Sequence, residues 1–199
     1  MNWYEKLNEY FPIEEMKSKK HMEMLLNEKG NVYFKDESPK HVLMYAEFDT
    51  FLFIDYLWVS SATRGQGIGH KLIQKLKAKN KPIILEVEPV DYEDTDSEKR
   101  LHFYRREDFS HAHSIGYNRR SLATNETTPM EILFWSPDGD AEEVIFEQMK
   151  QMYVDIHTYK DEEIYGKPYQ SAEEVLSYDK NRNSKDILKS LDKQKPKKS

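Results

Sequence analysis

A stretch of thirty residues without a single Asp or Glu is the feature that most limits how this chain can fold. Residues 56–85 read YLWVSSATRGQGIGHKLIQKLKAKNKPIIL, in a chain whose formal net charge is −6. The stretch holds one arginine and five lysines, a formal +6, so the other residues together carry −12. A local reversal of charge of this size, centred on a glycine-rich turn, indicates a site for an anionic ligand.

The sequence on both sides of the glycine-rich turn predicts a strand, a helix and a second strand. Residues 51–59 are almost continuously apolar, which is typical of a central strand covered on both faces. Apolar residues recur at helical spacing from Ile68 to Leu76, and residues 82–88 again have the pattern of a strand. Because a helix joins them, the two strands are expected to lie parallel, with the turn at the carboxyl end of the first. Ligands of open α/β sheets bind at that position.

The segments around this unit complete an α/β pattern. Helices are expected within residues 2–28, with a break at Pro12, and from the capping-box pattern Thr95-x-x-Glu98 to about residue 106. Further strands are expected at residues 31–34, 41–48, 113–117 and 130–136. We therefore predict one α/β domain over residues 1–137, with its N-terminal helices in 2–28.

Residues 138–199 are predicted to form a C-terminal helical extension that ends in a polar tail. Its apolar stripe at helical spacing consists of Ala141, Ile145, Met149, Met152 and Ile156. Such a stripe packs against the domain or against a second subunit, so the sequence leaves a homodimer open. A shorter helix is expected to start at Ser171, and the final KQKPKKS reads as a solvated tail.

Composition removes several classes of function. The chain has no cysteine, so disulfides, thiolate zinc sites and cysteine nucleophiles are excluded. We expect no signal peptide and no membrane partner, because no run is long and apolar enough, and hence a cytoplasmic protein. The acidic balance argues against a nucleic-acid partner. His111 and His113 have a metal-like spacing but no third ligand near in sequence, so no metal site is expected.

The spacing of the glycines separates this turn from two familiar phosphate-binding loops. A P-loop needs Gly, four residues and then Gly-Lys-Ser/Thr, which does not occur here. The dinucleotide fingerprint needs Gly-x-Gly-x-x-Gly, whereas these glycines stand at positions 65, 67 and 69. The sequence therefore supports neither a kinase nor a dehydrogenase.

The turn does fit the pattern Arg/Gln-x-x-Gly-x-Gly/Ala, as Arg64-Gly65-Gln66-Gly67-Ile68-Gly69, and Phe103-Tyr104 follows at a suitable distance. This pairing resembles the GNAT superfamily of N-acetyltransferases, over roughly residues 32–136. The resemblance implies an α/β fold with a central mixed, mostly antiparallel sheet flanked by helices. It also implies transfer of an acetyl group from acetyl-coenzyme A (acetyl-CoA) to an amine acceptor.

The resemblance assigns expected roles to individual residues. Backbone groups of Leu57, Trp58 and Val59 would pair with the pantetheine arm of acetyl-CoA. Backbone N–H groups of the glycine turn would hold its pyrophosphate, from Arg64, Gly65, Gln66, Gly67, Ile68 and Gly69. Lys71 or a neighbouring lysine would meet the 3′-phosphate, and Tyr104 would donate a proton to the departing thiolate. The chain departs from the family pattern at Ser97 and Arg100, which concerns contacts along the cofactor, and at Asp108, which concerns the end of the helix.

An acceptor amine must be neutral to attack, so a base or a water relay is needed. Glu86 and Glu88 alternate on one strand, and we expect Glu88 to be the base because it is nearer the carboxyl end. The other reading of Glu88 is a solvated carboxylate, and that of Tyr104 is a packed aromatic residue. Two functions follow: an N-acetyltransferase acting on a primary amine by direct attack, or a catalytically silent acetyl-CoA-binding sensor or interaction protein.

Overall fold

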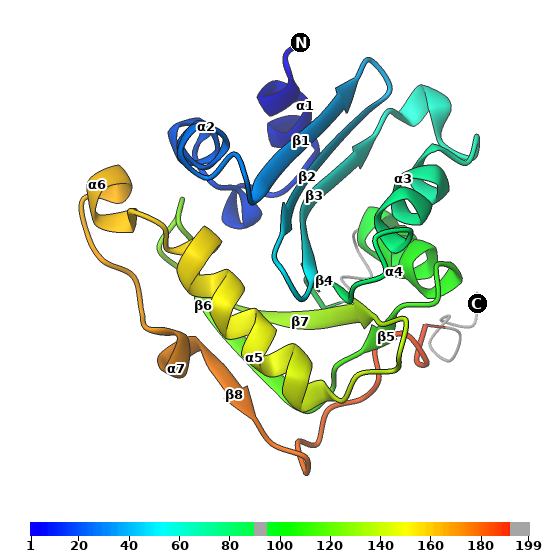
Figure 1. Cartoon of the computed structure of the whole chain (residues 1–199), viewed down its shortest axis with the longest axis vertical. Coiled ribbons are helices and arrows are strands. Elements are labelled where there is room, and N and C mark those ends of the chain that lie inside the picture. Colours follow the sequence, from blue (N-terminus) through cyan, green and yellow to red (C-terminus); the bar gives the residue numbers. More distant parts are fainter. Residues whose placement is uncertain (90–94, 192–199) are drawn as a thin grey trace, which may run out of the picture.

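The structure, a computed structural model, describes residues 1–89 and 95–191. In this part of the chain eight strands form one mixed sheet in the order β1-β2-β3-β4-β7-β6-β8, with β5 paired to β7 (Figure 1). The β3–β4 pair is parallel, and the other pairs are antiparallel. The predicted mixed, mostly antiparallel sheet is confirmed. The strands are β1 (Tyr33–Ser38), β2 (His41–Glu47), β3 (Leu52–Val59), β4 (Ile83–Val87), β5 (Ser110–His111), β6 (Ile115–Arg120), β7 (Thr127–Trp135) and β8 (Leu176–Tyr178).

Helices flank both faces of this sheet. They are α1 (Trp3–Tyr10), α2 (Lys19–Glu28), α3 (Ile68–Lys77), α4 (Thr95–Arg106), α5 (Glu142–Met152), α6 (Asp161–Tyr165) and α7 (Ala172–Val175), with 3₁₀ turns η1 (Ile13–Glu15) and η2 (Ser61–Thr63) and a π-helical turn η3 (Tyr153–His157). The expected break at Pro12 is confirmed, because α1 ends before it and η1 begins after it. Asn2 and Ser18 cap α1 and α2 with their side chains.

Alternate residues of the central strands pack into two cores, one on each face of the sheet. In β2, Met44 packs into the core that contains residues of α1, α2 and α5. Its neighbours Leu43 and Tyr45 pack into the core that contains residues of α3 and α4. This period of two is what a strand covered on both faces requires. The helices α1, α2 and α5 thus lie on one face, and α3 and α4 on the other (Figure 1).

The sheet divides between its two parallel strands. Pairing joins Leu52–Ile54 of β3 to Ile83–Leu85 of β4, whereas β3 continues to Val59 and β4 to Val87. A β-bulge lies at the start of this divergence: Tyr45 of β2 faces Ile54 and Met44 faces Tyr56, so Asp55 is an extra residue in β3. Bulges bend a strand and re-aim its side chains. The bulge and the divergence together open a cleft between β3 and β4.

Three strands differ from the sequence prediction. The strand expected at residues 31–34 is β1, which starts at Tyr33 and runs on through the polar Lys-Asp-Glu-Ser to Ser38. It is an edge strand whose exposed positions carry no apolar signal. The short strands β5 and β8 were not predicted. β5 pairs with β7, and β8 lies in the extension and pairs with β6.

The apolar stripe of the extension is buried within this chain. Ile145, Met149, Met152 and Ile156 are at most 1% exposed and belong to the core that also contains Met22 of α2. The stripe therefore packs against the domain, the first of its two expected alternatives, and a homodimer remains a prediction that these residues do not support. No helix of the described residues has the length and apolar character that crossing a bilayer requires.

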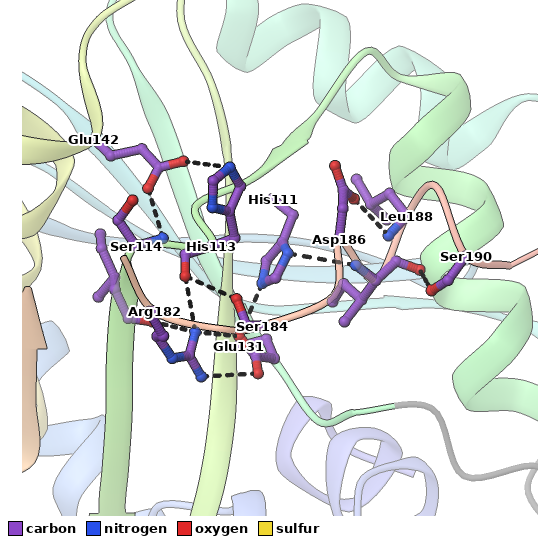
Figure 2. A network of polar contacts seen from close by, with 12 residues as sticks. His111, His113, Ser114, Glu131, Glu142, Arg182, Ser184, Asp186, Leu188 and Ser190 are labelled. Atoms are coloured by element: carbon purple, nitrogen blue, oxygen red, sulfur yellow. Dashed lines mark hydrogen bonds and ion pairs between the residues drawn. The ribbon is translucent and has the colours of Figure 1, made fainter. Parts of the chain in front are cut away.

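Beyond β8, residues 179–191 form a segment that we call the C-terminal strap. Arg182 donates to both carboxylate oxygens of Glu131, each at 3.1 Å, and to the carbonyl oxygen of Ile115 at 2.7 Å (Figure 2). His111 also bonds Glu131, at 2.8 Å. Further on, Leu188 packs into the core beneath α4. The strap thus connects the end of the sheet to α4.

Candidate active site

The diverging strands β3 and β4 form the walls of a cavity of about 500 Å³. Residues from α1, η1, β3, the glycine turn, β4, α4 and β6 line it. One cavity therefore joins the predicted phosphate-binding turn to α4 and to the N-terminal segment. Of the predicted site residues, those that line it are Leu57, Val59, Arg64, Gly65, Gly67, Ile68, Gly69 and Tyr104. Trp58, Gln66, Lys71 and Glu88 are not among the described residues that line it.

The conformation of the glycine turn depends on its glycines. Gly65 and Gly67 have φ angles of +81° and +74°, which L side chains rarely adopt, and Gly67 is the N-cap of α3. A Cβ atom on Gly69 would lie 3.1 Å from ring carbons of Phe103, so this glycine lets α3 approach α4 closely. No acidic residue stands in the first turn of α3. The N–H groups of Arg64 and Gln66 donate to the carbonyl oxygens of Ser61 and Thr63, at 3.4 and 3.3 Å. The backbone N–H groups at the start of α3 and the helix dipole favour an anion here.

Most of the lysines that follow the turn are engaged by acidic groups from other elements. Lys75 binds Asp36 of β1 at 2.6 Å, and Lys79 and Lys81 bind Glu47 of β2 at 2.6 and 3.2 Å. The charge reversal in the sequence is therefore partly neutralised in the fold. Lys71 lies on the exposed side of α3, beyond the residues that line the cavity.

Tyr104 is an aromatic residue of α4 that lines the cavity and carries a hydroxyl group. It is 7% exposed and packs edge-on against Phe103 and Phe109, with ring centroids 5.2 and 5.3 Å away. Burial raises the pKa of Tyr104, Arg100 lowers it, and Tyr10 and Glu15 raise it, with a net upward shift. The hydroxyl therefore keeps its proton at neutral pH, as a general acid requires.

Comparison with known proteins decides the family. A family model described as "Acetyltransferase (GNAT) domain" matches residues 29–111. A protein of Bacillus subtilis (strain 168) named "Putative acetyltransferase YjbC" is 64% identical over 191 residues, which are 96% of this chain and 100% of the relative. This chain belongs to the GNAT acetyltransferase family. It is an acyltransferase that takes acetyl-CoA as its acyl donor.

A solved structure shows the same fold at a greater distance. A Bacteroides thetaiotaomicron protein described as "Putative acetyltransferase from GNAT family" superimposes with a TM-score of 0.59 and 23% identity. The match covers 78% of this chain and 90% of that chain. At this identity the likeness concerns the fold of the GNAT domain.

In this GNAT acetyltransferase, the candidate base Glu88 and its strand neighbour Glu86 lie in different surroundings. Glu88 follows β4, is partly exposed and is not among the described residues that line the cavity. Glu86 does line it, with Oε1 lying 3.2 Å from Nε of Arg119. Burial lowers the pKa of Arg119, but the adjacent Glu86 carboxylate raises it, and the net shift is upward. Glu86 and Arg119 thus form a nearly buried ion pair in the cavity wall.

The cavity also contains an acidic residue that the sequence did not indicate. Glu15 of η1 lines it, and Oε2 lies 3.5 Å from Nη1 of Arg100. Burial raises the pKa of Glu15 to about 7. No motif marks this residue, because it approaches α4 across 85 positions of the chain. The sequence shows only that it lies in the predicted N-terminal helical region, shortly after Pro12.

Among the described residues no group of three or more His, Asp or Glu side chains is arranged to hold a metal ion. His111 bonds Glu131 at 2.8 Å, and His113 lies 3.7 Å from Glu142 (Figure 2). The two histidines, which have a metal-like spacing in the sequence, are thus parts of the contacts that hold α5 and the strap.

Proposed function

We propose that this acetyltransferase moves the acetyl group from acetyl-CoA to a primary amine by direct attack. The observation that carries the proposal is the single cavity that contains the glycine turn, the Tyr104 side chain and the carboxyl groups of Glu15 and Glu86. An anion-binding turn and the Glu15 and Glu86 carboxyl groups in one cavity suit a donor that carries phosphates and an acceptor that carries an amine.

Acetyl-CoA would lie along the free edge of β3 beyond Ile54. Backbone groups of Leu57, Trp58 and Val59 would pair with its pantetheine arm, and such pairing does not depend on where a side chain points. Trp58 itself lies beside Lys6, whose Nζ is 5.6 Å from the ring centroid. The N–H groups of residues 64–69 would hold the pyrophosphate, and Lys71 would meet the 3′-phosphate at the exposed end.

The chemistry requires little beyond positioning and proton transfer. The lone pair of the amine attacks the thioester carbonyl carbon, a C–N bond forms and the C–S bond breaks. A backbone N–H group of β3 would polarise the carbonyl oxygen, and Tyr104 would donate its proton to the sulfur. Part of the acidic run after β4 lies outside the described residues, namely Asp91, Glu93 and Asp94. We propose that this run attracts the cationic form of the acceptor.

A thiol-release assay tests this function. The purified protein is incubated with acetyl-CoA and a panel of polyamines, amino acids, aminoglycosides and peptides, and free CoA is measured. We expect release with at least one primary amine and an acetamide product of the corresponding mass. Binding of CoA without thiol release across the panel would support the alternative of a silent binding protein. Absence of CoA binding would contradict both.

A further inference from the structure

The carboxyl group of Glu15 enters the cavity from a segment that lies outside the motifs of the donor site. Glu15 ends η1, between α1 and α2, and its side chain is 12% exposed. Oε2 faces Arg100 at 3.5 Å, whereas Oε1 is buried and has no hydrogen-bond partner among the described residues. A buried carboxylate oxygen without a donor is costly, unless a ligand supplies the donor.

The backbone on both sides of Met16 is fixed to β3. The Tyr56 hydroxyl donates to the carbonyl oxygen of Glu15 and accepts from the N–H of Lys17, both at 2.9 Å. Lys17 in turn places its Nζ 2.6 Å from Oδ1 of Asp55, the extra residue of the bulge, and both side chains are 2% exposed. The bulge thus presents two neighbouring side chains that hold the Glu15 segment over the cavity. This arrangement positions the carboxyl group at little further entropic cost.

We propose that Glu15 is the general base that accepts a proton from the acceptor amine. The inference rests on the proposed transfer to a primary amine and assigns one step of it. The ammonium group of the acceptor gives one proton to the Glu15 carboxylate, and its nitrogen then attacks the acetyl carbon. Tyr104 gives a proton to sulfur as the C–S bond breaks, and the second proton leaving nitrogen restores the tyrosine through solvent. Glu15 releases its proton to solvent, so one proton is released for each acetamide formed.

The groups that face Glu15 bring the pKa of its carboxyl group into the range that this role requires. Burial is the largest influence and raises its pKa to about 7; Arg100 of α4 and Arg119 of β6 lower the pKa, and Glu88 and Glu86 raise it. The hydroxyls of Tyr10, Tyr56 and Tyr104 also lie on the elements packed against η1, and the Lys17–Asp55 pair lies beneath it. A base with a pKa near the operating pH is both ionised and able to hold a proton, which is the best compromise for catalysis.

The test compares Glu15→Gln with two other glutamate variants, once an acceptor has been found for the wild-type protein. Glu14→Gln changes the adjacent residue of η1, which is not among the described residues that line the cavity. Glu88→Gln changes the rival base. We expect Glu15→Gln to lower kcat by about a hundredfold or more and to leave the Kd of acetyl-CoA within about twofold. In kcat against pH the wild type should lose activity below about pH 7, and this acid limb should be missing from Glu15→Gln.

Several results would overturn the proposal. Glu15→Gln could retain the wild-type kcat and acid limb, or Glu88→Gln could lose the limb instead. A weaker Kd for acetyl-CoA in parallel with kcat would indicate a structural role for Glu15. Partial recovery in Glu15→Asp would support the base, because a shorter carboxylate keeps the chemistry. These outcomes differ from failure of the proposed function, in which the wild-type protein itself releases no CoA with any amine.

Discussion

Glu15 is placed where its ionised form lowers the stability of the fold. Burial raises the pKa of this carboxyl from 4.5 to about 7, so between these pH values the folded protein holds a proton that the unfolded chain has lost. Stability therefore falls as pH rises from about 4.5 to 7 and then stays at the lower level. A difference of that size corresponds to at most about 3 kcal/mol. This loss of stability is typical of a functional rather than a structural residue.

Glu15→Gln should therefore make the protein more stable at pH 8, although it lowers activity. Glutamine has the shape of the protonated acid and avoids the cost of burying a charge. Thermal melts at pH 8 and pH 4.5 measure the effect, with Glu14→Gln as the control. We expect a higher Tm at pH 8 and no difference at pH 4.5, where the wild-type carboxyl is protonated. A lower Tm at pH 8 would show that the ionised carboxylate stabilises the fold through Arg100.

Tyr104→Phe separates the proton-donor role from packing. The phenyl ring keeps the contacts with Phe103 and Phe109, so the fold should be retained. Loss of the hydroxyl should lower kcat by about a hundredfold, with little change in the Kd of acetyl-CoA. Stopped-flow measurement of thiol release and calorimetric titration with CoA check the two values. Tyr45→Phe is the control, because Tyr45 belongs to the same core but is not among the described residues that line the cavity. Unchanged turnover in Tyr104→Phe would remove the acid role.

At the scale of elements, the glycine turn depends on backbone angles. Gly67→Ala forces a side chain onto a residue with φ of +74°, at a cost of about 1 kcal/mol, and its Cβ projects into open space beside the cavity. We expect acetyl-CoA binding to weaken by about tenfold to a hundredfold, as when a charged hydrogen bond is lost. Gly139→Ala is a matched control, because Gly139 also has open space around it and a φ of +70° but lies before α5. Equal Kd values for the two variants would contradict the phosphate role.

The elements that were predicted correctly are those whose signal is local. The strand, glycine turn, helix and strand of β3, α3 and β4 follow from periodicity and glycine spacing within forty residues, and the structure contains all four. The Phe103-Tyr104 motif likewise places Tyr104 on α4, in the same cavity as the turn. The position of Glu15, by contrast, depends on the Tyr56 hydroxyl and on Arg100, which are distant in sequence.

The features that the sequence does not show have physical causes of the same kind. The strand β8 has only three residues and exists because β6 offers it a free edge, which no local pattern records. The lysines after the turn looked available for phosphate, yet Asp36 and Glu47 from β1 and β2 hold three of them. Charge counted along a chain therefore overstates the field at a site when the countercharges come from other strands.

At the scale of the whole molecule, the C-terminal strap contributes to the stability of the core. Arg182→Ala removes both hydrogen bonds that Arg182 donates to the Glu131 carboxylate. The Glu131 side chain, which is only 13% exposed, then loses two of its donors. We expect a loss of about 1–3 kcal/mol in the free energy of unfolding, measured from urea midpoints. Lys180→Ala is the control in the same strap, because its contact with Glu143 is exposed and should matter little. Equal midpoints for the two variants would mean that the strap is not held by Arg182.

The short pairing between β3 and β4 also affects how firmly the two halves of the sheet are joined. Backbone pairing joins the two halves of the sheet through three residue pairs, and beyond them the edge of β3 has no partner strand among the described residues. Backbone pairing thus gives the two halves only this short connection, and packing in the two cores supplies the rest. An extended ligand bound along that edge would connect the two halves of the sheet. Substrate and product both have the same pantetheine arm, so the enzyme would be stiffest while occupied and would loosen only when CoA departs.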